Sequence, residues 1–329
     1  SFNPRRQVGQ RKAGGQGKMR RAQAGGGRWG GALTLALALS GCAPPPGPEG
    51  GQCLSAAPAV VSIPQGEGRM GSDAAYPEER PARPVRSGGF SIDAVEVSNA
   101  AFARFVAATG YITDAERPQP GFEVPGAAVF AYPTPENPSW WRFVEGASWR
   151  APEGPGSSIE GLEALPVVQV SQRDAVAYAA WAGGRLPTET EWEFAARAGS
   201  TTRYVWGDAL APEGVLQANT WQGPFPVRNS GDDGYLSRAP GGCFPPNGFG
   251  LYDMIGNVWE WIEDCSSRSY IGRPKDATPW EWPGCQRRIQ RGGSWITAPA
   301  RSRSAYHGDG RPTDRSVFFG FRVVRELSE

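Results

Sequence analysis

Histidine and cysteine limit the chemistry that this chain can perform. The sequence has 329 residues with one histidine, His307, and five cysteines. A three-histidine zinc site, a two-histidine iron site and a Ser-His-Asp triad at any other histidine are excluded, and the cysteines lack zinc-site spacing. His307 is a candidate acid or base, since histidine titrates near neutral pH. The alternative is an ordinary surface or hydrogen-bonded histidine.

Cys42 has the sequence context of a lipidation site. Three arginines, at positions 20, 21 and 28, precede an apolar stretch over residues 32–39, and the chain then reads Leu39-Ser40-Gly41-Cys42. This order is typical of a secretory signal, and its ending resembles a bacterial lipobox, in which the cysteine becomes the lipidated first residue. We expect upstream sequence and a signal peptide over residues 1–41 and a Pro/Gly-rich tether over 42–57. The alternative is a buried hairpin or helix with a chance cysteine.

The expected location is the bacterial cell envelope. Ala43 follows the lipobox cysteine where an inner-membrane lipoprotein would have Asp, so similarity to bacterial lipoproteins favours the outer membrane, facing the periplasm or the surface. The chain has no run of about 18 apolar residues, so membrane contact is expected through the lipid anchor only. Removing the eight basic residues of 1–41 from the total of 34 leaves 26 against 33 acidic residues, a net charge of −7. This charge argues against a nucleic-acid partner.

An exported chain permits disulfides, and four cysteines remain besides Cys42. Cys265 and Cys285 are 20 residues apart and bracket a loop rich in Trp and Pro. We predict a disulfide between them. The pairing of Cys53 and Cys243 stays open.

The elements that must position these residues are few and short. A strand is predicted at residues 60–63, and helices are predicted after Ser98, after Ser171 and after Thr188, each with an N-capping residue and a Gly near its end. The second helix is expected to use Val176, Ala179 and Ala180 as its apolar positions. Residues 117–160 are interpreted as an ordered loop held by tryptophans. Few helices and many loops predict a single irregular α+β domain over residues 58–329.

Several spaced motifs resemble the formylglycine-generating enzyme (sulfatase-modifying factor) family. The resemblance covers about residues 58–326 with the motifs in family order. They are Gly184-Arg185-Leu186-Pro187-Thr188-Glu189-Thr190-Glu191-Trp192-Glu193, Gly256-Asn257-Val258-Trp259-Glu260-Trp261, Arg291-Gly292-Gly293-Ser294-Trp295 and Gly320-Phe321-Arg322. The resemblance implies a loop-rich α+β fold related to C-type-lectin-like variants. It also implies an activity, the oxidation of a sulfatase cysteine to formylglycine with oxygen and copper held by two cysteines.

The copper site that the resemblance implies is not preserved in this sequence. The first copper-binding cysteine is expected two positions after Trp295, where this chain has Thr297, and residues 298–306 contain no cysteine. A hydroxyl cannot replace a soft thiolate ligand of Cu(I). Copper is therefore not expected. Ser294 and Trp259 match groove positions of the family and remain groove candidates with His307, the alternative being ordinary turn and core residues.

Calcium sites are implied at positions that are preserved. One set matches the side chains of Asn219 and Asp233 with the carbonyls of Thr220 and Tyr235. A second set matches Asp253 and Glu260 with the carbonyls of Gly256 and Val258. Carboxylate, amide and carbonyl oxygens are the ligands that Ca²⁺ prefers. The alternative is turn-forming Asn and Asp.

Three functions remain open at this point. The first is a formylglycine-generating oxidoreductase, which needs the missing cysteine pair. The second is a calcium-stabilised binding or accessory lipoprotein with a peptide or protein ligand in the groove. The third is a related oxidative modification in the same groove, although iron chemistry of the sulfoxide-synthase type would need more histidines than the chain has. We favour the second.

Overall fold

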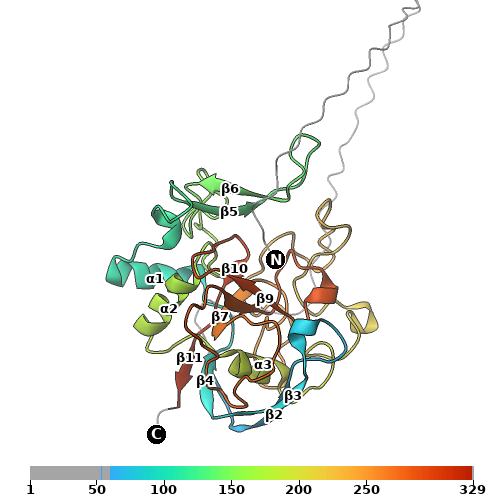
Figure 1. The fold of residues 1–329 in the computed structure, drawn as a ribbon. Helices are drawn as coiled ribbons and strands as arrows, with labels where there is room; N and C mark the ends of the chain where they lie inside the picture. The colour runs from blue at the N-terminus through green and yellow to red at the C-terminus, as the bar shows by residue number, and fades with distance from the viewer. Residues whose placement is uncertain (1–52, 54–59, 328–329) are drawn as a thin grey trace, which may run out of the picture. The chain divides into compact units, whose positions relative to one another are not determined.

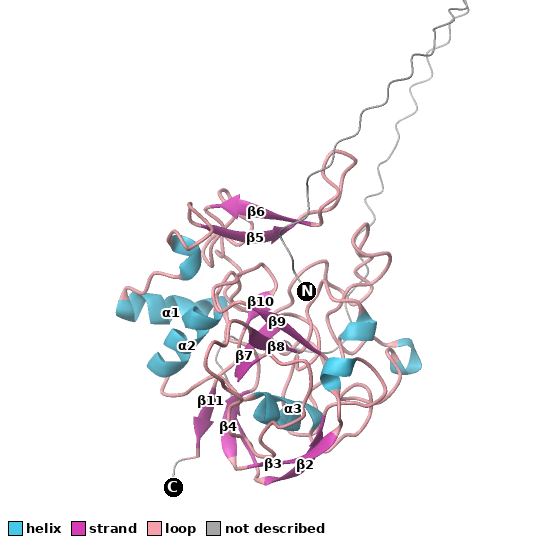
Figure 2. Cartoon of the chain, viewed as in Figure 1, coloured by secondary structure: helices cyan, strands magenta, loops and turns pink. Residues whose placement is uncertain are grey.

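The computed structural model describes Cys53 and residues 60–327, and short elements joined by long loops make up this part of the chain (Figures 1 and 2). The predicted signal peptide, Cys42 and most of the predicted tether lie outside the described residues. No helix in the described ranges is long and apolar enough to cross a membrane. The described part is a mixed α+β fold with few helices, as predicted.

The described residues contain three α-helices, each of which begins where the sequence supplies a cap. Helix α1 (Asn99–Thr109) begins at Ser98, whose side chain accepts the Ala101 N–H, and ends at Gly110 with φ +67°. Helices α2 (Gln172–Trp181) and α3 (Glu189–Arg197) both begin with a capping box. Since a capping box satisfies N–H groups that would otherwise lack partners, these helix starts were predictable from local sequence.

Two details of the helices differ from the prediction. Helix α3 ends at Arg197 and is capped by Ala198, which adopts the left-handed conformation one residue before the expected Gly199. In α2 the apolar face consists of Ala175, Tyr178 and Ala179, whereas Val176 is 45% exposed and Ala180 is also exposed. The capping box starts the helix at Gln172, and this phase turns Val176 outward.

A four-stranded sheet in the order β10-β7-β8-β9 lies at the centre of the domain. Strands β7 (Trp259–Cys265), β8 (Arg288–Arg291) and β9 (His307–Gly310) are antiparallel neighbours, and β10 (Phe319–Gly320) runs parallel to β7. On β7, Trp261 packs with the α1 and α2 core, which includes Phe102 and Tyr178. Ile262 packs with the α3 core. The sheet therefore separates two hydrophobic cores.

The remaining strands form three small sheets. They are β1 (Val60–Ile63) with β4 (Phe90–Asp93) and β11 (Val324–Glu326), β2 (Gly66–Met70) with β3 (Arg83–Ser87), and β5 (Gly126–Phe130) with β6 (Trp141–Glu145). Single 3₁₀ turns occur at Pro77–Glu79, Asp114–Glu116, Pro212–Gly214 and Pro299–Arg301. The expected strand at 60–63 is confirmed.

The β5–β6 hairpin corrects the interpretation of residues 117–160 as a loop (Figure 1). The strands were not predicted because proline and glycine residues flank the hairpin on both sides. The expected tryptophan anchor is present, since Trp149 is fully buried and packs edge-on against Phe102.

Candidate functional site

Two glycines make the turn that carries Ser294. Strand β8 ends at Arg291, and Gly292 and Gly293 follow with φ +92° and +83°. A Cβ on Gly293 would lie 2.8 Å from Ser302 Oγ, so a larger residue could not take this position without displacing Ser302. The turn therefore brings Ser302 close to the backbone just before Ser294.

Hydroxyl groups fill this turn. Thr297 Oγ1 accepts the Ser294 N–H at 3.0 Å and forms a second hydrogen bond with Ser294 Oγ, also at 3.0 Å. Ser294 is fully buried, and Thr297 is 8% exposed. Ser302 Oγ is buried and has no hydrogen-bond partner among the described residues. The residue expected to be a thiolate is thus a threonine that holds Ser294 in place.

The cysteines of the described part are all disulfide-bonded. Cys265 and Cys285, the pair predicted from sequence, are joined with 5.9 Å between their Cα atoms. Cys53, inside the predicted tether, is joined to Cys243, a pairing that the sequence had left open. No thiolate is available here to bind a soft metal ion, so the described residues do not fit a two-cysteine copper site.

Two of the three groove candidates, Trp259 and His307, lie on opposite faces of the central sheet. Cross-strand pairing places Glu260 opposite Arg291 and Arg291 opposite His307, so these side chains share the face of the sheet toward α3. Trp259 alternates to the other face and packs against Tyr306, with ring centroids 5.8 Å apart. His307 is 6% exposed, and its Nε2 lies 3.4 Å from the Glu78 carbonyl oxygen. This position does not support a role as a groove acid or base.

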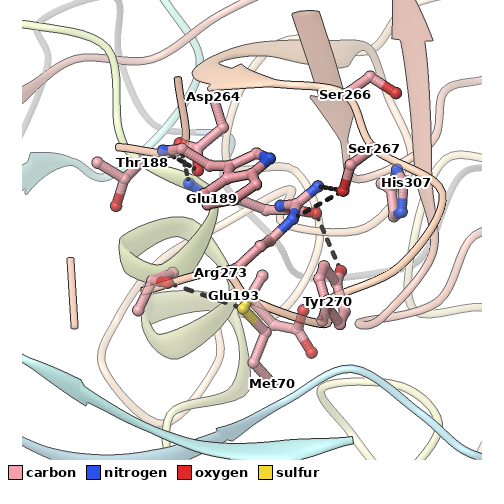
Figure 3. Close-up of polar contacts among 12 residues, drawn as sticks. Met70, Thr188, Glu189, Glu193, Asp264, Ser266, Ser267, Tyr270, Arg273 and His307 are labelled. Carbon is pink, nitrogen blue, oxygen red and sulfur yellow. Dashed lines mark hydrogen bonds and ion pairs between the residues drawn. The ribbon is translucent and has the colours of Figure 1, made fainter. Parts of the chain in front are cut away.

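His307 instead borders a buried ionic network centred on Glu189 (Figure 3). Glu189 accepts the Tyr270 hydroxyl at 3.0 Å and is ion-paired with Arg273 and with Arg291. Burial opposes ionisation of Glu189, but the charges of Arg273, His307 and Arg291 outweigh it and lower its pKa to about 2. The network ties the start of α3 to the sheet, so its role is structural.

Charged residues in and just before α3 also form ion pairs and hydrogen bonds with one another. Arg185 forms two hydrogen bonds of 2.7 Å with Glu191. Arg197 pairs with Glu193 at 2.8 Å. The Glu residues at the start of α3 are therefore used for capping and ion pairing.

The residues of the first predicted calcium set lie in the loop that follows residue 218. Asp233 Oδ2 accepts the Thr220 N–H at 2.9 Å, and its Oδ1 accepts the Tyr235 N–H at 3.0 Å. Asn219 is fully buried, and its Oδ1 has no partner among the described residues. Burial raises the pKa of Asp233 although these N–H groups stabilise its charge. Gln222 Nε2 also donates to Asp233 Oδ2 and to the Thr220 carbonyl, so within the described part of the chain Asn219 Oδ1 is the unpaired side-chain oxygen of this set.

The second predicted set contains a buried acid with incomplete hydrogen bonding. Asp253 has φ +55°, and its Oδ2 accepts the Gly242 N–H at 2.7 Å. Its Oδ1 is buried without a partner among the described residues. Glu260 differs, because Arg322 and the Trp192 indole already occupy both of its oxygens. Asp253 therefore has oxygen free for a cation, and Glu260 is already neutralised.

Glu96 is a site residue that the sequence analysis missed. Both of its carboxylate oxygens are buried without a partner in the described part of the chain. Burial, and then the negative charge of Asp253, raise the pKa of Glu96 well above its ordinary range. Burial also raises the pKa of Asp253 to about 6. Two neighbouring buried acids with three unpaired oxygens need a counter-charge, which a divalent cation would supply.

A sequence signal for Glu96 did exist. It lies between Val95 and Val97, directly before the Ser98 cap of α1. An acid flanked by apolar residues at the start of a packed helix is expected to be buried, and buried acids need partners.

Hydrogen bonds between Asn219 and Asn257 link the two predicted calcium sets. Asn257 donates its N–H to the Asn219 carbonyl at 2.9 Å, and its Oδ1 accepts from Asn219 Nδ2 at 3.2 Å. A Cβ on Gly256 would lie 2.3 Å from the same carbonyl oxygen. The described residues contain no group of three His, Cys, Asp or Glu side chains arranged for a metal ion. Calcium would therefore depend on carbonyl and amide oxygens as well as carboxylates.

A small hollow beside the Ser294 turn borders the first calcium set. The space between its lining atoms, including part that is open to solvent, is about 200 Å³. This space is too narrow to enclose a water molecule. Its lining residues are Tyr204, Trp206, Leu210, Leu216, Gln217, Ala218, Thr220, Ile255 and Ser302. A peptide would therefore have to bind across the surface of this region, because the hollow cannot enclose it.

Comparison with known proteins gives a consistent pattern. A family model described as a sulfatase-modifying factor enzyme 1-like domain matches residues 49–327. A formylglycine-generating enzyme from Thermomonospora curvata is 47% identical over 283 residues, covering 81% of this chain and 93% of the relative. An inactive C-alpha-formylglycine-generating enzyme 2 from Mus musculus is 40% identical over 280 residues, covering 81% and 85%. The chain is thus similar to relatives named as enzymes and to relatives named as inactive.

The solved structure of PvdO from Pseudomonas aeruginosa shares this fold. It superposes with a TM-score of 0.64 at 30% identity, covering 84% of this chain and 98% of PvdO. The likeness covers nearly all the described residues, so the irregular α+β architecture is that of a known fold.

Proposed function

Because this chain belongs to the sulfatase-modifying factor enzyme 1-like family, we propose that it is a lipid-anchored, calcium-stabilised binding or accessory member that does not make formylglycine by the copper route. The observation that carries the proposal is the hydroxyl pair of Thr297 and Ser294. Family membership alone leaves the activity undecided, since one fold hosts several functions.

The absence of a copper ligand set supports the non-catalytic part of the proposal. Thr297 Oγ1 is engaged by Ser294, and the four cysteines of the described part are consumed in two disulfides. Oxygen activation at Cu(I) would need thiolates beside Ser294. The hydroxyls there hold the turn together and offer no soft ligand.

Unpaired oxygens support the calcium part of the proposal. Asn219 and Asp253 would supply side-chain oxygens for the two sites, and Glu96 would join the second. Bound calcium would neutralise the buried acids and tie down loops that lack strands and helices. Its contribution is to stability.

The lipobox supports anchoring, and the match of Ser294 and Trp259 to groove positions of the family supports a ligand. Cys42 would hold the domain in the cell envelope, and the expected ligand is a peptide or protein bound near Ser294 and Trp259. Net charge and the lack of a basic stripe in the sequence after residue 41 argue against nucleic acid.

The test of the function is a direct assay. Purified protein is incubated with copper, oxygen, a reductant and a peptide containing Cys-x-Pro-x-Arg, and the peptide mass is measured. We expect no aldehyde product above the level of a protein-free reaction. Formation of the aldehyde that is lost on substitution of Ser294 or Trp259 would overturn the proposal.

A second candidate function is formylglycine generation itself. It is favoured by the 47% identity to an enzyme of that name, which exceeds the 40% identity to the inactive relative. The same assay decides between the two, because only the second candidate predicts turnover.

A further inference from the structure

The side-chain amide of Gln222 contacts two residues of the first predicted calcium set. Gln222 follows Asn219 by three positions in the sequence and is buried. Its Nε2 donates to the Thr220 carbonyl oxygen and, at 2.7 Å, to Asp233 Oδ2. Both oxygens belong to the predicted ligand set, and carbonyl and carboxylate oxygens are the ligands that Ca²⁺ prefers. One side-chain nitrogen thus bridges two oxygens that a bound calcium ion would also bridge.

The amide and a cation would compete for the same lone pairs. Asp233 Oδ2 accepts the Thr220 N–H at 2.9 Å in addition to Gln222 Nε2, so two donors use both lone pairs of this oxygen. The Thr220 N–H belongs to the main chain that carries Asn219 and the Thr220 carbonyl, so the donor that can leave is Gln222. Asn219 Oδ1, buried without a partner among the described residues, adds an unused oxygen to the set. These residues fit a cation once the amide moves away.

The main chain of Gln222 is held independently of its side chain. Its N–H donates to Asn229 Oδ1 at 3.1 Å, and its carbonyl oxygen accepts the Ser230 N–H at 2.9 Å. Gln222 Oε1 is buried and has no partner within the described part of the chain. A buried acceptor without a donor costs free energy, which rotation of the side chain toward water would recover. The amide can therefore leave by side-chain rotation while the loop keeps its path.

We propose that the Gln222 amide stands in for calcium in the first set, holding Thr220 and Asp233 together until the ion displaces it. The inference rests on the calcium part of the proposed function. The amide keeps the two oxygens near each other before the ion binds. It also weakens binding, since the ion can bind only in the fraction of molecules from which the amide has moved away. Gln222 is thus a positioning residue that sets the calcium affinity of this loop.

The test measures calcium affinity by titration calorimetry on the purified full-length chain carrying Glu96→Gln, which removes a proposed ligand of the second set. In this background, Gln222→Met keeps the length of the side chain and removes its N–H donors. We expect calcium to bind about tenfold more tightly than with Gln222 present. The variant should also melt at a lower temperature in chelator, because Thr220 and Asp233 lose their shared donor.

Gln217→Met is the matched control for this substitution. Gln217 lies in the same loop, and its Nε2 donates to the Val215 carbonyl at 3.1 Å, outside both calcium sets. We expect the control to keep the calcium affinity of the background chain. Equal or weaker affinity in Gln222→Met than in Gln217→Met overturns the inference. Absence of calcium binding in the native chain overturns the calcium part of the proposed function, and this inference with it.

Crystal structures of the native chain grown with calcium and with chelator test the displacement without a variant. With calcium, we expect an ion bound to the Thr220 carbonyl and Asp233, and Gln222 Nε2 no longer within hydrogen-bond distance of either oxygen. With chelator, both Gln222 contacts should be present. An ion in the first set with both contacts intact overturns the inference. An ion in the second set alone also overturns it, although the calcium proposal then survives for the second set.

Discussion

At the scale of single residues, the Thr297 hydroxyl holds the turn around Ser294. The Thr297 hydroxyl oxygen accepts the Ser294 N–H and also forms a hydrogen bond with the Ser294 hydroxyl, so both side chains are hydrogen-bonded within the turn. Ser302 contributes a third hydroxyl against Gly293. Hard neutral oxygens at this point stabilise the turn and leave Cu(I) without a preferred ligand.

Two cysteines placed in this turn should restore copper binding. We expect Thr297→Cys/Ser302→Cys to bind Cu(I) at least about tenfold more tightly than the native chain, a difference of about 1.4 kcal/mol. Competition with a chromogenic Cu(I) chelator measures it. Thr297→Cys/Ser304→Cys is the matched control, because Ser304 is also fully buried. Equal affinity for the two variants would show that Ser302 does not complete the site.

Glu96 should be needed for stabilisation by calcium. We expect a chelator to lower the melting temperature of the native chain, since an ion at 100 times its Kd stabilises the folded state by about 2.7 kcal/mol. Glu96→Gln should remove much of this response, because its unpaired carboxylate oxygens are the proposed ligands. Thermal unfolding with calcium and with chelator measures the effect, and exposed Glu160→Gln serves as the control. A native calcium response in Glu96→Gln contradicts the assignment.

At the scale of elements, the buried network joins α3 to the central sheet. Glu189 at the first turn of α3 receives contacts from Tyr270, Arg273 and Arg291, and Asp264 on β7 accepts the Glu189 N–H at 2.9 Å. Burial and the charge of Glu189 raise the pKa of Asp264 to about 7. Helix and sheet are therefore held together by charges whose ionisation depends on pH.

Acid should weaken the ion pairs of Glu189. The pKa of Glu189 is about 2 in the folded chain against an ordinary value of 4.5, so its ion pairs contribute stability above pH 4.5 that is lost as the pH falls toward 2. The contribution is roughly 3 kcal/mol. We expect Glu189→Gln to be less stable at pH 7 and to approach the native chain near pH 2.5. Urea unfolding at both pH values measures this. A constant difference between the two proteins would contradict the linkage.

The loop between β7 and β8 should depend on its disulfide. We expect Cys265→Ser/Cys285→Ser to lose about 3 kcal/mol of unfolding free energy, because the bond closes a loop with a sequence separation of 20 residues. Urea unfolding of the variant and the native chain tests the size of the loss. Peptide mapping without reduction should recover the two cysteines as one linked pair, and recovery of free thiols would refute the pairing.

Sequence alone was sufficient for elements with a local signal and insufficient for those without one. Capping boxes predicted α2 and α3, and spaced motifs predicted the family fold. The β5–β6 hairpin was not predicted because its strands pair across a Pro-rich loop, and strand pairing is not a local property of the sequence. Glu96 and Asp253 are 157 positions apart in the sequence, so only the fold reveals that their charges interact. Strand register, which residue type does not reveal, turns His307 toward α3.

At the scale of the whole molecule, irregular loops are held by covalent and ionic links instead of regular structure. Distant segments are joined by two disulfides, by the network around Glu189 and by the hydrogen bonds between Asn219 and Asn257. Such links replace the hydrogen-bond ladders that the loops lack. The domain is therefore expected to keep its shape in an oxidising, calcium-containing compartment.

Removal of the lipid site should release the molecule. We expect Cys42→Ala to move the protein from the membrane fraction to the soluble fraction of an expressing bacterium, and intact mass should place acyl groups on the native cysteine. Fractionation followed by mass measurement checks both statements. A mature chain that begins elsewhere without lipid would contradict the predicted anchor.

The bond between Cys53 and Cys243 closes a covalent ring that contains all three α-helices and the first six strands. A protease that cuts once anywhere between residues 54 and 242 therefore opens the ring without dividing the molecule. A cut between residues 266 and 284 is bridged in the same way by the second disulfide. Single cuts can detach a piece of the described domain only between residues 244 and 264 or after Cys285. Much of the loop-rich surface can thus be nicked while both fragments stay attached to each other.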